Sequence, residues 1–199
     1  MFRDEMDNCF IDTTIEFLSV AFHNILYYAS IYPRSIFEKR KKYSVVIYRS
    51  MHPEVNQYID LCLKSIMHCL KSGQLSRIEF SITDNTYTPV VKFVFDLDKN
   101  GQFDGSTDAY LVQTEENFRA FCLIMSSMSH RFNNLPEDCS FTIHLHTNES
   151  AAVTMATNPD LEDFPLVEVD EVEESTNKIL PLRRFTLRNY SLDAYIEIR

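Results

Sequence analysis

The sequence of 199 residues predicts a single α+β domain. Three segments carry apolar residues at helical spacing, and alternating apolar and polar runs between and after them are typical of half-buried strands. Hydrophobic residues make up 45% of the chain, which is ordinary for a globular domain with a substantial core.

The first two predicted helices are separated by an extended segment. Apolar residues recur at helical spacing over residues 11–25, and this pattern stops before Pro33. Residues 37–48 are predicted to be extended. A second helix starts at Pro53, which suits a first helical turn, and ends at Gly73. Its apolar stripe consists of Val55, Ile59, Cys62, Ile66 and Leu70.

Two alternating runs then predict a hairpin of half-buried strands, with its turn at residues 84–86. A third helix is predicted over residues 114–133, and further strands over residues 141–145, 185–188 and 192–198. The apolar residues of the two half-buried runs are Ile78, Phe80 and Ile82, then Val91, Phe93, Phe95 and Leu97. The third helix is expected to turn Phe118, Phe121, Cys122, Met125 and Phe132 inward, and Phe141, Ile143 and Leu145 mark the next strand.

An acidic segment, residues 150–176, shows no sustained period and contains Pro159 and Pro165. Unpatterned stretches of about 25 residues are longer than most loops and tend to be functional or disordered. Between Phe132 and Lys178 there are eleven acids and no Lys or Arg, so the net charge of -10 leaves +1 for the rest of the chain. We therefore expect no direct binding of nucleic acid, whose phosphates attract cations.

Cysteine usage and hydropathy indicate a compartment. Five cysteines without tight pairs favour the reducing environment of the nucleus or cytosol. No apolar run that could act as a signal peptide follows Met1. The longest apolar pattern, residues 11–29, is interrupted by Glu16 and Asn24, so we expect neither a membrane span nor a membrane partner.

Six segments together carry a family resemblance. They are IYPRSIFEKRKKYSVVIYRSMHPEVNQYI (31–59), VVKFVFDL (90–97), FRAF (118–121), CSFTIHLHT (139–147), EDFPL (162–166) and ILPL (179–182). In this order and spacing, the chain resembles the HORMA-domain family, and within it the accessory subunits of translesion DNA polymerase zeta.

The resemblance implies a HORMA domain over residues 1–199, with three main helices packed on a mostly antiparallel sheet. It implies a core, residues 1–149, and a C-terminal mobile seatbelt, residues 150–199, that wraps over an extended partner peptide added to the sheet. Such a domain is not an enzyme and needs no cofactor. The implied compartment is the nucleus, with the cytoplasm in addition.

The resemblance also implies the partners. The catalytic subunit of DNA polymerase zeta would supply a proline-containing peptide, and a Y-family scaffold polymerase would bind through its C-terminal domain. A homo- or hetero-HORMA dimer and an AAA-type ATPase remodeller complete the set.

Individual residues inherit roles from the same resemblance. Tyr58 falls on the peptide-contacting tyrosine of the family. Leu166 falls on a companion position that is tryptophan in vertebrate relatives, and loss of the indole removes a large flat surface and a hydrogen-bond donor from the peptide channel. Lys39 and Arg119 match residues of a dimerisation interface.

The outer-face site for the scaffold polymerase falls on Ile179, Asp193 and Tyr195, where relatives carry glutamine in place of Asp193. The alternation of residues 192–198 independently turns Asp193 and Tyr195 away from the core. An exposed tyrosine between two acids suits a protein-binding site. On spacing alone, an ordinary surface tyrosine is the simpler interpretation.

Metal binding is the main alternative to the adaptor function. Asp96, Asp98, Asn100 and Gly101 match the first, third, fifth and sixth positions of an EF-hand loop, but the twelfth position is Thr107, which lacks a carboxylate. His144 and His146 share a strand face, without a third ligand at a clear spacing. We favour a polar turn and ordinary histidines. No CxxC or GxSxG motif occurs.

Two further alternatives stay open. The run from Lys39 to Lys42 either contacts DNA phosphates or acts as an import signal, or it is a solvated strand edge blunted by charge. The chain could also be a HORMA adaptor of the spindle checkpoint, the meiotic axis or another DNA-repair or chromosome-end complex.

Overall fold

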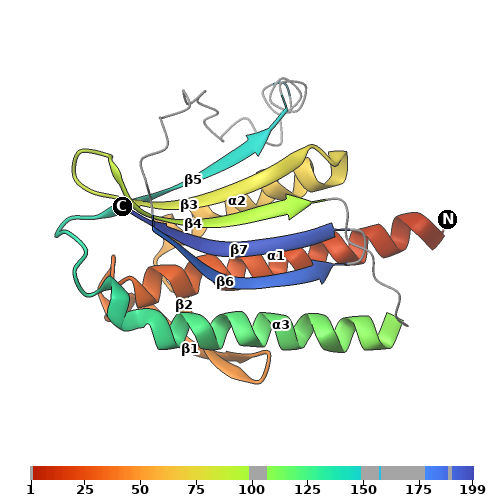
Figure 1. Cartoon of the computed structure of the whole chain (residues 1–199), viewed down its shortest axis with the longest axis horizontal. Coiled ribbons are helices and arrows are strands. Elements are labelled where there is room, and N and C mark those ends of the chain that lie inside the picture. The colour runs from red at the N-terminus through yellow and green to blue at the C-terminus, as the bar shows by residue number, and fades with distance from the viewer. Residues whose placement is uncertain (1, 99–106, 149–156, 158–177, 188–189) are drawn as a thin grey trace.

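The computed structural model describes residues 2–98, 107–148, 157, 178–187 and 190–199. In these residues, three long helices cover one face of an antiparallel sheet with the strand order β5-β3-β4-β7-β6 (Figure 1). The elements are α1 (Phe2–Tyr28), β1 (Phe37–Lys42), β2 (Val45–Ser50), α2 (Pro53–Ser72), β3 (Leu75–Thr83), β4 (Pro89–Asp98), α3 (Thr107–Met128), β5 (Ser140–Thr147), β6 (Lys178–Leu187) and β7 (Tyr190–Ile198), with short 3-10 helices at Arg34–Ile36 and Ser129–Phe132. The predicted class, α+β with helices on an antiparallel sheet, is confirmed.

The central helix α1 begins at Phe2, well before its apolar pattern, and its second half is buried on most sides. Phe17 stacks on Phe118 of α3 with ring centroids 4.3 Å apart. Two polar residues of α1 are also buried, because they bind the backbone of β2. The N–H of Tyr48 donates to Asn24 at 3.0 Å, and the N–H of Ser50 donates to Nδ1 of His23 at 3.3 Å.

The segment over residues 37–48 is a hairpin, β1–β2, and not one continuous extended run. Tyr43 and Ser44 form its turn with φ of 50° and 58°, as a tight hairpin turn requires at both central positions. Neither residue is of a type that favours this conformation, so the sequence did not indicate the turn. The Tyr43 ring is buried against Phe118, with centroids 5.3 Å apart, and this packing offsets the backbone cost.

The second helix and the hairpin after it follow the prediction closely. Pro53 is in the first turn of α2, every residue of the predicted stripe is buried, and Gly73 caps the helix with φ 67°. β3 and β4 pair antiparallel. The expectation of half-burial is wrong for β3, because Glu79, Ser81 and Thr83 on its outer face are also buried.

The C-terminal strands form a hairpin that lies on β4. β7 pairs with β4. Of the residues that the alternation turned inward, Leu192, Ala194 and Ile196 are at 0% exposure, and Ile198 is partly buried against the core. β6 begins at Lys178, earlier than predicted, and includes Pro181. It is an edge strand, where a missing N–H is tolerated. α3 packs against β6, and Arg183 donates two hydrogen bonds to Asn117 at 2.8 and 3.2 Å.

Candidate functional site

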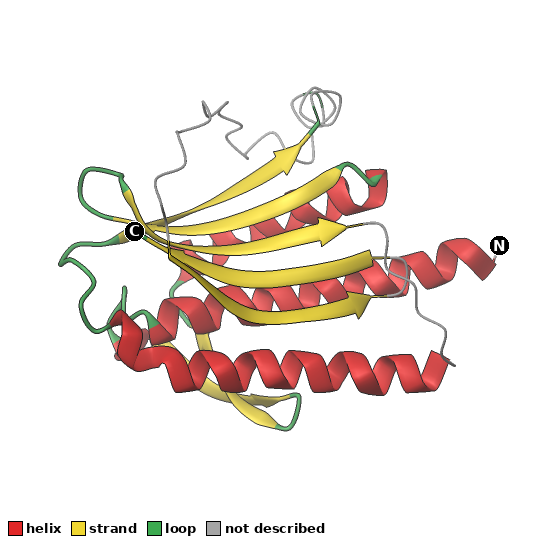
Figure 2. Cartoon of the chain, in the orientation of Figure 1, coloured by secondary structure: helices red, strands yellow, loops and turns green. Residues whose placement is uncertain are grey.

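The outer edge of β5 is one candidate site. β5 lies at the end of the strand order and pairs with β3, and no described strand lies on its other side (Figure 2). An edge strand presents backbone N–H and C=O groups that can pair with another chain. β6 forms the opposite edge, so the chain leaves the sheet at one edge and returns at the other.

Tyr58 is placed at this edge of β5. Its hydroxyl accepts the backbone N–H of Ile143 at 3.1 Å. Strand N–H groups point alternately to the two neighbours, and β3 occupies one side of β5. The N–H of Ile143 therefore points to the open edge, and Tyr58 reaches it from α2.

The Tyr58 ring is held in a partly apolar setting. It packs edge-on against Phe141 with ring centroids 5.4 Å apart. Burial, and then the neighbouring Cys62 thiol, raise the pKa of Tyr58 well above its ordinary value, so the phenol stays neutral. Leu166, its predicted companion, and the predicted seatbelt boundary at Ser150 lie outside the described residues.

A second candidate site lies on the outer face of the C-terminal hairpin. Asp193 and Tyr195 point outward from β7, and Glu197 is the next residue of β7 on this outer face. Ile179 of β6 is 61% exposed and lies directly opposite Glu197. The structure therefore brings the three predicted scaffold-binding residues onto one face. Tyr58 lies at the far edge of the sheet, three strands away from β7.

Tyr195 is half-buried, which the sequence did not predict. Its hydroxyl donates to Asp96 of β4 at 3.0 Å. Asp96 in turn accepts from Arg77 of β3 at 2.6 Å. Burial, and then the Asp96 charge, raise the pKa of Tyr195. Sequence alternation turned Tyr195 outward, but only the strand register shows that it meets Asp96 and Arg77.

Glu79 extends this network toward β5. Its carboxylate lies 3.1 Å from Lys92, 3.1 Å from His146 and 3.7 Å from Arg77. Burial alone would raise its pKa, but the hydrogen bond with His146 and the charge of Lys92 outweigh burial and lower the pKa of Glu79 to about 2. The outer face of β3 is therefore occupied by a neutralised charge cluster.

These contacts count against the metal alternatives. Asp96 is bonded to Arg77 and Tyr195, so it is not free to begin a calcium loop, and residues 99–106 of that loop lie outside the described residues. His144 and His146 share the outer face, as their spacing predicted, but His146 pairs with Glu79. Within the described chain, no group of three or more His, Cys, Asp or Glu could hold a metal.

The predicted dimerisation residues are both exposed. Lys39 lies on β1 and Arg119 on α3, whose helix packs against β2. Two other cations of the basic run are paired within the molecule, Arg40 with Glu38 and Lys42 with Glu16. Half of the run is thus neutralised, which weakens the case for phosphate binding.

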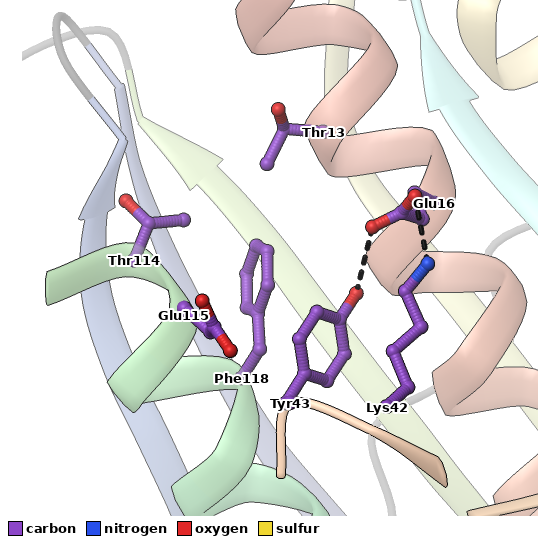
Figure 3. Close-up of a pocket in the computed structure, with 7 residues that line it drawn as sticks. All are labelled: Thr13, Glu16, Lys42, Tyr43, Thr114, Glu115 and Phe118. Atoms are coloured by element: carbon purple, nitrogen blue, oxygen red, sulfur yellow. Dashed lines mark hydrogen bonds and ion pairs between the residues drawn. The ribbon is translucent and has the colours of Figure 1, made fainter. Parts of the chain in front are cut away.

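A cavity of about 340 Å³ lies between α1, the β1–β2 turn and α3 (Figure 3). Its lining residues are Thr13, Glu16, Lys42, Tyr43, Thr114, Glu115 and Phe118. Glu16 accepts a hydrogen bond from Tyr43 at 3.4 Å and lies 2.7 Å from Lys42, so its carboxylate anchors the turn of the hairpin (Figure 3).

Among the described helices, none combines the length and apolar character that a membrane crossing needs.

Comparison with known proteins decides the family. The HORMA domain family matches residues 11–174. The chain belongs to the HORMA domain family. The human protein named Mitotic spindle assembly checkpoint protein MAD2B is 36% identical to this HORMA domain over 190 residues, which cover 94% of the chain and 90% of the relative. Drosophila melanogaster DNA polymerase zeta subunit 2 is 27% identical, with 93% and 96% covered.

Solved structures share the fold of this HORMA domain. A chain from the crystal structure of a mitotic checkpoint complex superposes with a TM-score of 0.79 at 17% identity, covering 95% of this chain and 98% of that chain. Caenorhabditis elegans HTP-2 bound to a HIM-3 closure motif gives a TM-score of 0.66 at 12% identity, covering 93% and 88%. The resemblance predicted from the sequence is confirmed, and the HORMA domain is an adaptor fold with relatives named as polymerase zeta subunits.

Proposed function

We propose that this HORMA domain is a non-catalytic adaptor that captures an extended peptide as an added strand on the edge of β5. The observation that carries this proposal is the position of the C-terminal hairpin, which pairs with β4 and leaves the β5 edge without a described partner strand. Strand addition supplies main-chain hydrogen bonds for affinity, and side-chain pockets select the sequence.

The relatives support a specific ligand. Because several are named as subunits of DNA polymerase zeta, we assign the captured peptide to the catalytic subunit of that polymerase and expect it to contain proline. Tyr58 and Leu166 line its channel. The outer patch of Ile179, Asp193 and Tyr195 receives the C-terminal domain of a Y-family scaffold polymerase, so that the adaptor links two polymerases in translesion DNA synthesis in the nucleus, with a cytoplasmic pool.

Residues 150–199 act in this proposal as a seatbelt that opens for the peptide and closes over it. Release from beneath a closed segment is slow, so affinity differences are expected mainly in the off-rate. Deleting this segment does not isolate its movement, because the deletion also removes β6 and β7 from the sheet. A reversible disulfide that locks β7 onto β4 keeps both strands and tests the movement alone.

The lock uses the outward pair Lys92 and Glu197, which are directly opposite each other on β4 and β7. Replacing both by cysteine places the thiols within the range that a disulfide spans. The oxidised protein should fail to capture added peptide, and reduction should restore capture. Equal capture rates in the oxidised and reduced protein would show that the hairpin need not move, and the seatbelt proposal would be wrong. The wild-type chain under the same two conditions is the control.

A second candidate is a HORMA adaptor of the spindle checkpoint, the meiotic axis or another DNA-repair or chromosome-end complex. The names of the human relative and of the mitotic checkpoint complex support the spindle checkpoint as this second candidate. Affinity purification followed by mass spectrometry of tightly bound proteins distinguishes it from the polymerase adaptor, because the captured partner differs.

Two further partners complete the proposal. Lys39 and Arg119, both exposed, form part of a dimer surface for a second HORMA domain. An AAA-type ATPase serves as remodeller, since a closed seatbelt releases its peptide slowly without an input of energy.

A further inference from the structure

We infer that Asp96, supported by Arg77, is a latch that holds the hydroxyl of Tyr195 and so fastens the C-terminal hairpin to the core. The inference rests on the proposed function in one respect, namely that the hairpin moves. It goes beyond that function because it gives Tyr195 a role apart from partner binding and assigns roles to two residues on other strands.

The hydrogen bond of the latch crosses between β7 and β4. Tyr195 donates to Oδ2 of Asp96 at 3.0 Å, and the residue opposite Tyr195 is Val94, so the contact is diagonal across the ladder. Asp96 belongs to the β3–β4 hairpin, whereas Tyr195 belongs to the segment that is proposed to move. The bond therefore exists only when β7 is on β4, and an interaction made in one state alone shifts the equilibrium toward that state.

Docking of β7 on β4 also brings two carboxylates together, and the hydrogen bond of the latch offsets their electrostatic repulsion. Asp96 and Asp193 are directly opposite each other in the β4–β7 register, on the same outer face. Like charges in this position are destabilising. Asp193 lies 3.6 Å from Arg184, but that pair is within the β6–β7 hairpin and is kept whether or not the hairpin is docked. The repulsion from Asp96 is felt only in the docked state.

Arg77 fixes the acceptor. Its Nε lies 2.6 Å from Oδ1 of Asp96 and its Nη2 lies 3.3 Å from Oδ2, so the guanidinium holds the carboxylate through two hydrogen bonds. A bidentate pair sets the plane of the carboxylate. The Nη1 of Arg77 is in turn 3.7 Å from the buried carboxylate of Glu79. The acceptor is therefore oriented from β3 before Tyr195 arrives.

Hydrogen exchange of the full-length chain tests the latch, read on peptides from residues 190–199. Tyr195→Phe removes the hydroxyl and keeps the ring, and should speed exchange of the β7 amides by about 3- to 10-fold. Asp193→Asn removes the repulsion and should slow it. The matched control is Tyr87→Phe, because Tyr87 is 80% exposed on the β3–β4 turn, and it should leave β7 unchanged.

A double variant separates positioning from general damage. If Asp96 acts through Tyr195, the Tyr195→Phe change should have little added effect in an Asp96→Asn background, since interacting pairs are not additive. Additive effects, or β7 exchange in Tyr195→Phe equal to that of Tyr87→Phe, would overturn the latch. Peptide release is measured on the same variants: faster exchange with unchanged release supports the latch but contradicts the seatbelt.

Discussion

The hydroxyl of Tyr58 accepts the backbone N–H of Ile143 at 3.1 Å, although the two residues are 85 positions apart. Through this bond, α2 satisfies a donor at the edge of β5 that would otherwise need water or a partner strand. In the proposed capture, a carbonyl group of the peptide takes the place of the Tyr58 hydroxyl as acceptor for the N–H of Ile143. Tyr58 would then border the added strand.

Tyr58→Ala should weaken peptide capture by about 2 kcal/mol or more, as loss of a buried aromatic anchor often does. Titration calorimetry with the polymerase zeta peptide measures the effect. Tyr58→Phe should cost less, because the peptide brings its own acceptor for Ile143. An unchanged circular dichroism spectrum is required of both variants. If Tyr58→Ala unfolds, the residue belongs to the core and the assigned role is wrong.

Ile179→Ala should lower affinity for the scaffold polymerase domain by about 1 kcal/mol or more and leave peptide retention unchanged. Ile179 is 61% exposed, so it tests the outer patch without breaking the Tyr195 latch. Val46→Ala, at a side chain 55% exposed on the β1–β2 hairpin, is the matched control. Equal loss of both partners in the Ile179 variant would indicate damage to the sheet and not two separate sites.

Arg119→Ala should shift a dimer to monomer without loss of thermal stability, because its side chain is exposed on α3. Light scattering after size-exclusion chromatography gives the mass. Lys39→Ala should act in the same direction. Arg131→Ala, at another exposed arginine just beyond α3, is the control, and a dimer that survives both of the first two changes would show that the interface lies elsewhere.

Glu79→Gln should destabilise the fold at neutral pH. The pKa of Glu79 is lowered from 4.5 to about 2 by His146 and Lys92 despite its burial. The carboxyl of Glu79 binds its proton less readily in the folded than in the unfolded chain. The ionised carboxylate therefore contributes on the order of 3 kcal/mol to the free energy of unfolding above about pH 4.5, and this contribution is lost as the pH falls through about 2.

Urea unfolding at several pH values checks this expectation. The difference between wild type and Glu79→Gln should shrink as the pH falls from neutral toward 2. Glu137→Gln, at an exposed acid, provides the baseline for charge change alone. A difference that does not vary with pH would mean that shape, and not charge, is what Glu79 contributes.

His23 should make the fold acid-sensitive in a different window. Burial, then the charges of Arg49 and Arg40, lower the pKa of His23 from 6.5 to about 4. The unfolded chain takes up this proton first, so stability falls as the pH drops from about 6.5 to about 4, by roughly 1.4 kcal/mol per pH unit. His23→Asn keeps an acceptor for Ser50 and should flatten that slope, whereas His130→Asn, at an exposed histidine, should not.

Sequence periodicity predicted whether most elements are helices or strands and which of their faces is buried, because both properties depend on residues that are close in the sequence. The stripe of α2 and the alternation of β7 were both correct, since burial on one side of a regular element repeats with that element's own period. The outward direction of Tyr195 followed from the same rule. The resemblance to the HORMA family added the expected roles of Tyr58 and the outer patch.

The register between distant segments was decided by the tertiary structure. Nothing in the sequence places Asp96 opposite Asp193, brings Arg77 to Asp96, or sets the Tyr58 hydroxyl at the N–H of Ile143. The β1–β2 turn was missed for a related reason, because Phe118, far along the chain, holds Tyr43 in a conformation that its own type disfavours. The periodicity of a helix or strand shows which way each side chain points. Which residue a side chain contacts depends on which strands pair, and strand pairing is decided only when the whole sheet packs against its helices.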